Sequence, residues 1–182
     1  EELLGPAGTG ITEAAQMAER RARSAGESFQ KELQSIQERA KQASAKLEEV
    51  RAALRKQREG QSARRVLVQA HEKIEKAEKA LTATAEAELP FLKGVETLAQ
   101  SEAMQAVKDS ETAAAKTETA VDLAKTFIRA KLTESKSKYC KAVGKRVVEE
   151  LTELQGRAEG LGKRLRDFKR ETSTRKMATL HV

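Results

Sequence analysis

Apolar residues recur at steps of three and four through most of this chain, with charged and polar residues between them. The longest such pattern extends from Val121 to Phe168 and predicts one C-terminal helix over residues 109–170. The same spacing predicts a first helix over residues 12–58 and a second over 62–108. Each helix would turn one narrow apolar stripe toward a partner and its other faces toward water.

Helix boundaries are predicted from capping residues and helix breakers. Gly60, followed by Ser62, is typical of a helix end and of the cap of the next helix. Pro90 removes a helical hydrogen bond, so we expect a kink there. The alternative is a true break at Pro90, with the third helix starting near Val95 or Ser101. The sequence Asp109-Ser110-Glu111 combines capping residues with an acidic first turn and predicts the start of the third helix.

Together these elements predict an all-α fold. We expect an elongated antiparallel three-helix coiled-coil bundle with very long helices, kinked near Pro90. In layout, though in no motif, it resembles the construction of spectrin repeats and BAR domains. Residues 1–11 and 171–182 lack the periodic pattern and are expected to be flexible arms.

Six large apolar residues represent the stripes that would hold helices together. The predicted packing seam includes Phe29, Leu33, Ile36, Val147, Leu151 and Leu154. The first half of the first helix has an Ala-rich seam, and small residues bury little apolar area each. We therefore expect that half to be the weaker part of the bundle and to need a partner.

Composition agrees with long helices and excludes several classes of protein. Only 3% of the 182 residues are aromatic, whereas 35% are charged. The single cysteine, Cys140, excludes an internal disulfide framework and favours the cytoplasm or another reducing compartment. The sequence has no apolar run of the length that spans a bilayer.

The formal net charge of +7 is concentrated near the C-terminus, where residues 109–182 hold seventeen basic and eleven acidic groups. We predict an anionic-partner site formed by Lys125, Arg129, Lys131, Lys136, Lys138, Lys141, Lys145 and Arg146. A second cluster contains Lys163, Arg164, Arg166, Lys169 and Arg170. The alternative is that these residues solvate the helices and pair with Glu on neighbouring ones.

The chemistry required for catalysis is missing from the sequence. The glycines between Gly5 and Gly10 lack the Lys that a phosphate-binding loop needs. His71 and His181 have no partner at metal-ligand spacing, and Cys140 has no recognisable base. We therefore predict a protein that is not an enzyme and has neither a cofactor nor a metal site.

The leading functional hypothesis is a non-catalytic structural or scaffold component that acts through coiled-coil helix–helix interactions within a larger protein assembly. One alternative is a BAR-like module, in which a homodimer would gather two basic clusters against an anionic membrane surface. Another is a cytoskeletal or acidic-filament binder that uses the same cluster on an acidic protein surface. Nucleic acid is the weakest candidate partner because base stacking needs exposed aromatic residues.

Overall fold

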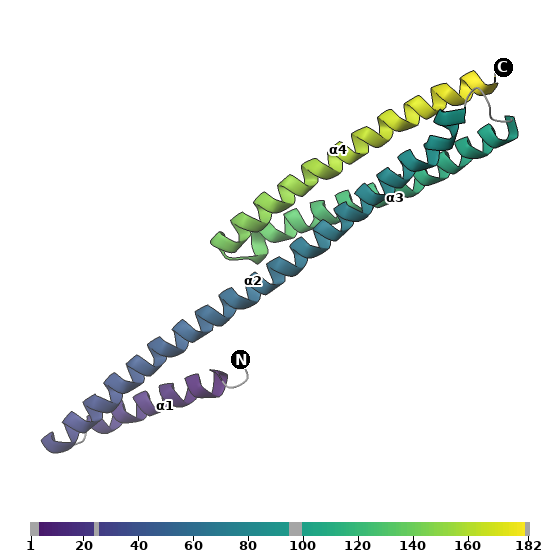
Figure 1. Cartoon of the computed structure of the whole chain (residues 1–182). Coiled ribbons are helices and arrows are strands. Elements are labelled where there is room, and N and C mark those ends of the chain that lie inside the picture. The colour runs from purple at the N-terminus through teal and green to yellow at the C-terminus, as the bar shows by residue number, and fades with distance from the viewer. Residues whose placement is uncertain (1–3, 24–25, 95–99, 181–182) are drawn as a thin grey trace. The chain divides into compact units, whose positions relative to one another are not determined.

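A computed structural model describes residues 4–23, 26–94 and 100–180, and these residues form four α-helices and no β-strand (Figure 1). The helices are α1 (Leu4–Ala22), α2 (Glu27–Gly94), α3 (Gln100–Lys138) and α4 (Lys141–Leu180). The predicted all-α class is therefore confirmed. The chain divides into two compact units, Glu1–Glu59 and Gly60–Val182, and α2 contributes residues to both.

In the first unit, α1 packs antiparallel against residues 27–59 of α2. Arg51 Nη2 donates a hydrogen bond to the carbonyl oxygen of Leu4 at 3.0 Å. A Cβ added to Gly8 would lie 3.3 Å from Leu47 Cδ2, so a glycine at this position allows the two helices to approach closely. The buried apolar residues of this unit are small, namely Ala18 and Ala40.

In the second unit, residues 60–94 of α2 share one core with α3 and α4. Its members come from all three helices, so each turns an apolar face to the other two. The largest fully buried apolar side chains are Ile74, Ile128, Leu151, Leu154, Val121 and Val147. Helices α3 and α4 follow each other in the sequence and lie side by side in opposite directions (Figure 1). This bundle carries the chain's main hydrophobic core.

The predicted first helix over 12–58 is wrong at both ends. Helical structure begins at Leu4, inside the expected flexible arm, and α1 ends at Ala22. The carbonyl oxygen of Gly26 accepts hydrogen bonds from the backbone amides of Phe29 and Gln30, at 3.0 and 3.3 Å. Gly26 therefore opens α2, whereas the sequence predicted one continuous helix over residues 12–58.

The predicted break at Gly60 is also wrong, because α2 continues through it. Gly60 does not adopt a positive φ, the conformation that a helix-closing glycine needs. An interior glycine costs a helix about 1 kcal/mol relative to Ala. Burial of Ala63 and Val66 in the core directly after Gly60 favours continuation of the helix.

Pro90 lies inside α2, which extends to Gly94, so the alternative of a true break at Pro90 is not observed. The predicted continuation of this helix to residue 108 is wrong. Helix α3 begins at Gln100, which agrees with the alternative start near Ser101. Val95, the other alternative start, and the positions 96–99 lie outside the described residues.

The predicted single helix over 109–170 is divided between α3 and α4. Asp109 lies in the interior of α3, and Ser110 is fully buried, so the expected helix start there is wrong. The two helices are separated by Tyr139 and Cys140, and Gly144 donates its backbone hydrogen bond to the Cys140 carbonyl at 2.8 Å. Helix α4 extends to Leu180, so most of the expected C-terminal arm is helical.

In the part of the chain that the structure describes, no helix is both long enough and apolar enough to cross a membrane.

Candidate interaction surfaces

The predicted anionic-partner residues lie on both sides of the turn between α3 and α4, and we call this set of residues the basic corner. Its α3 members are Lys125, Arg129, Lys131, Lys136 and Lys138, and its α4 members are Lys141, Lys145 and Arg146. Lys125 and Lys131 are half-buried, and the other six are exposed. The turn was not predicted, so the sequence placed these residues along one helix rather than at a junction of two.

Four of the eight basic residues form ion pairs within their own helices. Lys131 and Lys138 contact opposite oxygens of Glu134, at 2.5 and 2.6 Å. On α4, Arg146 pairs with Glu150 at 2.9 Å, and Lys145 lies 3.9 Å from Glu149. These pairs support the alternative that part of the cluster serves helix solvation and local pairing.

Glu134 is the carboxylate that pairs with two lysines in the last turns of α3. Hydrogen bonds from Lys131 and then Lys138, together with their charges, lower its pKa from 4.5 to about 2. The same contact raises the pKa of Lys138. Lys131 Nζ also lies 5.9 Å from the ring centroid of the half-buried Phe127. Lys131 and Lys138 are therefore engaged by the fold itself.

The remaining members of the basic corner, Lys125, Arg129, Lys136 and Lys141, have no observed ion pair with any described residue. Lys136 is in the last turn of α3, where the helix dipole favours a cation. Lys141 is the first residue of α4, and that turn contains no acidic residue. A cation at a helix N-terminus is disfavoured by the dipole, so helix stability does not explain Lys141.

The six predicted seam residues separate into two groups. Val147, Leu151 and Leu154 are at most 2% exposed and pack in the core of the second unit. In the first unit, Leu33 is half-buried, whereas Phe29 is 63% exposed and Ile36 is 41% exposed. The α4 seam therefore stabilises the bundle itself, and the α2 seam presents apolar side chains to solvent.

The exposed seam residues belong to a regular heptad pattern. Alternate steps of four and three connect residues 29, 33, 36, 40, 43, 47, 50 and 54, which are all apolar. We call Phe29, Ile36, Ala43 and Val50, which are seven residues apart, the α2 stripe. Val50 is 48% exposed and Ala43 is half-buried. Helix α1 contacts α2 near Leu47 and Arg51 and leaves the large residues of the α2 stripe open.

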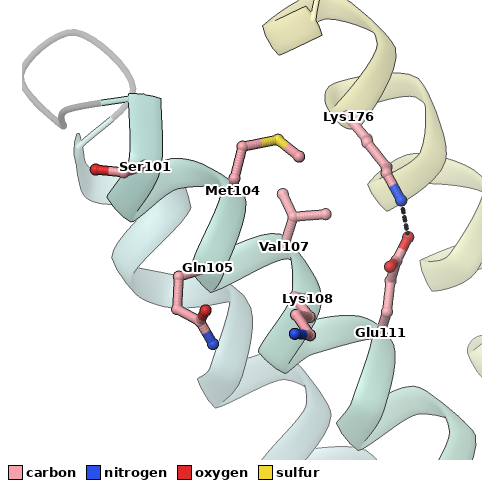
Figure 2. A pocket seen from close by; sticks show the side chains of 7 residues that line it. All are labelled: Ser101, Met104, Gln105, Val107, Lys108, Glu111 and Lys176. Atoms are coloured by element: carbon pink, nitrogen blue, oxygen red, sulfur yellow. Dashed lines mark hydrogen bonds and ion pairs between the residues drawn. The ribbon is translucent and has the colours of Figure 1, made fainter.

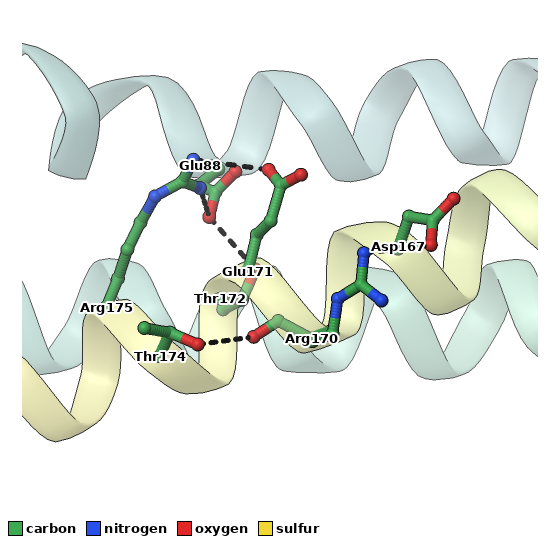
Figure 3. Close-up of polar contacts among 7 residues, drawn as sticks. All are labelled: Glu88, Asp167, Arg170, Glu171, Thr172, Thr174 and Arg175. Atoms are coloured by element: carbon green, nitrogen blue, oxygen red, sulfur yellow. Dashed lines mark hydrogen bonds and ion pairs between the residues drawn. The ribbon is translucent and has the colours of Figure 1, made fainter.

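A buried polar contact joins α2 to α4 in the half of the second unit that lies away from the basic corner (Figure 3). Glu88 is only 6% exposed. Its Oε1 accepts hydrogen bonds from Thr172 Oγ1 at 2.9 Å and from Arg175 Nη1 at 2.5 Å. Sequence periodicity missed this site because Glu88 and Arg175 are far apart in the chain and each looks like an ordinary surface charge.

A shallow hollow of about 330 Å³ lies at the start of α3 (Figure 2). Met104 and Val107 supply its apolar wall, and Lys176 from α4 closes it with an ion pair to Glu111 at 2.7 Å. Its lining contains Ser101 but neither His nor Cys.

No protein-family model matches the chain, and no protein of curated function or solved structure is significantly similar to it.

Proposed function

We propose that this protein is a non-catalytic scaffold component that joins a larger protein assembly through coiled-coil contacts of its first unit. The observation that carries the proposal is the exposure of Phe29, Ile36 and Val50 within a regular heptad pattern. A heptad seam is stabilised by side chains packing into a facing helix, and α1 supplies only part of that contact. A further helix laid along the α2 stripe would complete the seam.

The energetics of the first unit support the same proposal. Its fully packed apolar side chains are Ala18 and Ala40, and each buries far less area than a Leu or Ile. A two-helix unit of this kind gains little free energy from its own core. Burial of Phe29 and Ile36 against a partner would add about 1.5–3 kcal/mol for each side chain.

The test compares native assemblies in source cells that contain either the natural chain or an Ile36→Asp variant. We expect the natural chain to migrate as part of a large complex in native electrophoresis and the variant to migrate as the free chain. Leu123→Asp is the matched control, because Leu123 is 58% exposed but belongs to α3 in the second unit. An Ile36→Asp chain that stays in the same complex would refute the proposal.

A second candidate function is binding to an anionic surface, such as an acidic membrane, through the basic corner. The observation that favours it is Lys141 at the unfavourable N-terminal end of α4, close in sequence to the unpaired Lys136. Near an anionic membrane, each such residue contributes about 1 kcal/mol of attraction. This attraction would offset the unfavourable interaction of Lys141 with the helix dipole.

Lys141→Glu tests this second candidate because it should raise the stability of α4 and lower the retention of the protein on anionic vesicles. An acidic first residue should stabilise α4 by about 0.3–1 kcal/mol, which urea unfolding measures. Retention on vesicles that contain phosphatidylserine should fall. The control is Lys79→Glu, which makes the same charge change at an exposed position on α2. Equal loss of retention in both variants would show that vesicle binding depends on the net charge of the protein and not on the position of Lys141.

A further inference from the structure

The outer edge between α3 and α4 has a ladder of ion pairs at heptad spacing. Lys176 contacts Glu111 at 2.7 Å, and Lys169 contacts Glu118 at 2.5 Å. The two acidic residues are seven apart on α3, and the two lysines are seven apart on the antiparallel α4. The next step of the ladder therefore places Lys125 opposite Gly162.

The close approach of these two positions is observed directly. Gly162 is buried, and a Cβ added to it would lie 2.6 Å from Lys125 Nζ. The same Cβ position lies 3.7 Å from Arg166 Nη1. One cation from α3 and one from α4 thus converge on the space that a side chain at position 162 would fill. We call Lys125, Gly162 and Arg166 the cationic rung.

The charges at the cationic rung differ from those of the two rungs before it. The earlier rungs join an acidic residue of α3 to a lysine of α4, whereas this one brings two basic side chains together. Two cations that approach the same point repel each other, and an anion bound between them would offset that repulsion. Arg129, one turn beyond Lys125 on α3, is also exposed and adds positive charge on the same side.

Among the residues that the structure describes, neither Lys125 nor Arg166 forms an ion pair with a carboxylate. Positions three and four residues from Arg166 on α4 are occupied by Gly162, Lys163, Lys169 and Arg170. Near Lys125 the corresponding acidic residue is Asp122, one carboxylate for two cations. One turn before Gly162, Glu159 accepts a hydrogen bond from Gln155 Nε2 at 2.9 Å.

We propose that the cationic rung binds a phosphate-type oxyanion, either free inorganic phosphate or the phosphate monoester of a lipid headgroup. Lys125 would donate from α3 and Arg166 from α4, and the absence of a side chain at Gly162 lets the Lys125 ammonium lie against α4 beside Arg166. A phosphate has several acceptor oxygens and close to two negative charges at neutral pH, which matches two converging cationic donors. This site does not depend on the scaffold function proposed above, because it lies in the second unit.

The test titrates the full ¹⁵N-labelled chain with inorganic phosphate at constant ionic strength, with chloride in the reference samples. We expect saturable shifts of the Gly162 and Arg166 amide signals. Lys125→Gln and Arg166→Gln should each weaken phosphate binding about tenfold, because each removes a charged hydrogen-bond donor. Lys163→Gln is the matched control, with the same charge change next to Gly162 but outside the rung, and should retain the natural affinity.

Gly162→Glu provides an independent test because it introduces a carboxylate at the expected position of the ligand. This variant should keep its helicity and lose phosphate binding. If it misfolds, Gly162→Ala serves instead, because its Cβ displaces the end of Lys125 and should weaken binding. Equal shifts with chloride, an equal loss in Lys163→Gln, or natural affinity in the variant at position 162 would overturn the proposal.

Vesicles distinguish the two sources of phosphate. Retention on phosphatidic acid vesicles that inorganic phosphate displaces, and that Arg166→Gln reduces, would assign the site to a lipid headgroup. Saturable binding of inorganic phosphate without retention on vesicles would assign it to a soluble phosphate. Saturation by neither probe would overturn the proposal.

Discussion

Several residues have roles that their local sequence does not reveal. Glu88 resembles any other helix-surface carboxylate in the sequence, yet it is buried and accepts hydrogen bonds from Thr172 and Arg175 (Figure 3). Thr84 and Thr117 share a buried hydrogen bond of 2.8 Å in the same unit. Ser110 is fully buried, and its hydroxyl has no hydrogen-bond partner among the described residues. Polar groups thus replace part of the apolar core in this half of the bundle.

The ion pair between Glu88 and Arg175 predicts that substitution of Arg175 alone lowers the stability of the second unit. Arg175→Met should destabilise the second unit by about 1–3 kcal/mol, because it leaves the buried carboxylate without its cationic partner. Urea unfolding followed by circular dichroism measures the loss. Arg170→Met removes a more exposed pair with Asp167 and should change stability by less than about 1 kcal/mol. Equal effects in the two variants would contradict the assigned role of Arg175.

At the scale of elements, the end of α3 is held by one carboxylate and two lysines. Glu134 has a pKa lowered to about 2 from the ordinary 4.5, so folding favours its ionised form. The stabilising contribution is therefore complete above about pH 4.5 and is lost as the pH falls toward 2. Lys138 has a raised pKa, so its contribution is present below its ordinary pKa and is lost at strongly alkaline pH.

The lowered pKa of Glu134 predicts an acid-dependent loss of helicity at the end of α3. In the natural chain, NMR of the Glu134 side-chain carboxyl should show a midpoint well below 4.5, and the α3 amide signals should report fraying over the same range. Glu134→Gln should show the frayed signals already at pH 7. Glu153→Gln removes an exposed carboxylate of α4 and should leave these signals unchanged. A normal midpoint for Glu134 would disprove the contact.

The sequence predicted helical structure better than it predicted the helix boundaries. Apolar periodicity correctly predicted helical structure through most of the described residues. It did not predict where one helix ends and the next begins, because α1 ends at Ala22, α2 at Gly94 and α3 at Lys138. The turn at Tyr139 and Cys140 contains neither Gly nor Pro, so no local signal marked it. Gly60, which did carry a signal, remains helical. A local penalty of about 1 kcal/mol is smaller than the effect of the surrounding packing.

At the scale of the whole molecule, the two units differ in how much apolar surface they bury. The second unit has Ile74, Ile128 and Leu151 fully buried, whereas the first buries Ala18 and Ala40. Global stability measured on the isolated chain should therefore belong mainly to the second unit. The first unit should open at a lower free energy, which leaves the α2 stripe available to a partner.

Leu151→Ala and Ile36→Ala test this division. Leu151→Ala should destabilise the second unit by about 2–5 kcal/mol, because it creates a cavity in the core. Ile36→Ala should leave that unfolding transition unchanged, since Ile36 is 41% exposed in the first unit. Urea titrations followed through amide signals of each unit make the comparison. A main transition that shifts equally in both variants would show that the two units unfold together.

The sequence by itself determined the all-α class, the basic cluster and the apolar seam of α4, because charge and periodicity are properties of short stretches of chain. Only the tertiary structure decided which residues lie opposite each other, as with Glu118 and Lys169 or Lys125 and Gly162. It also decided that Leu151 is buried and Phe29 exposed, although both occupy seam positions. Periodicity identifies the apolar face of a helix, but the packing of distant helices determines whether that face is covered.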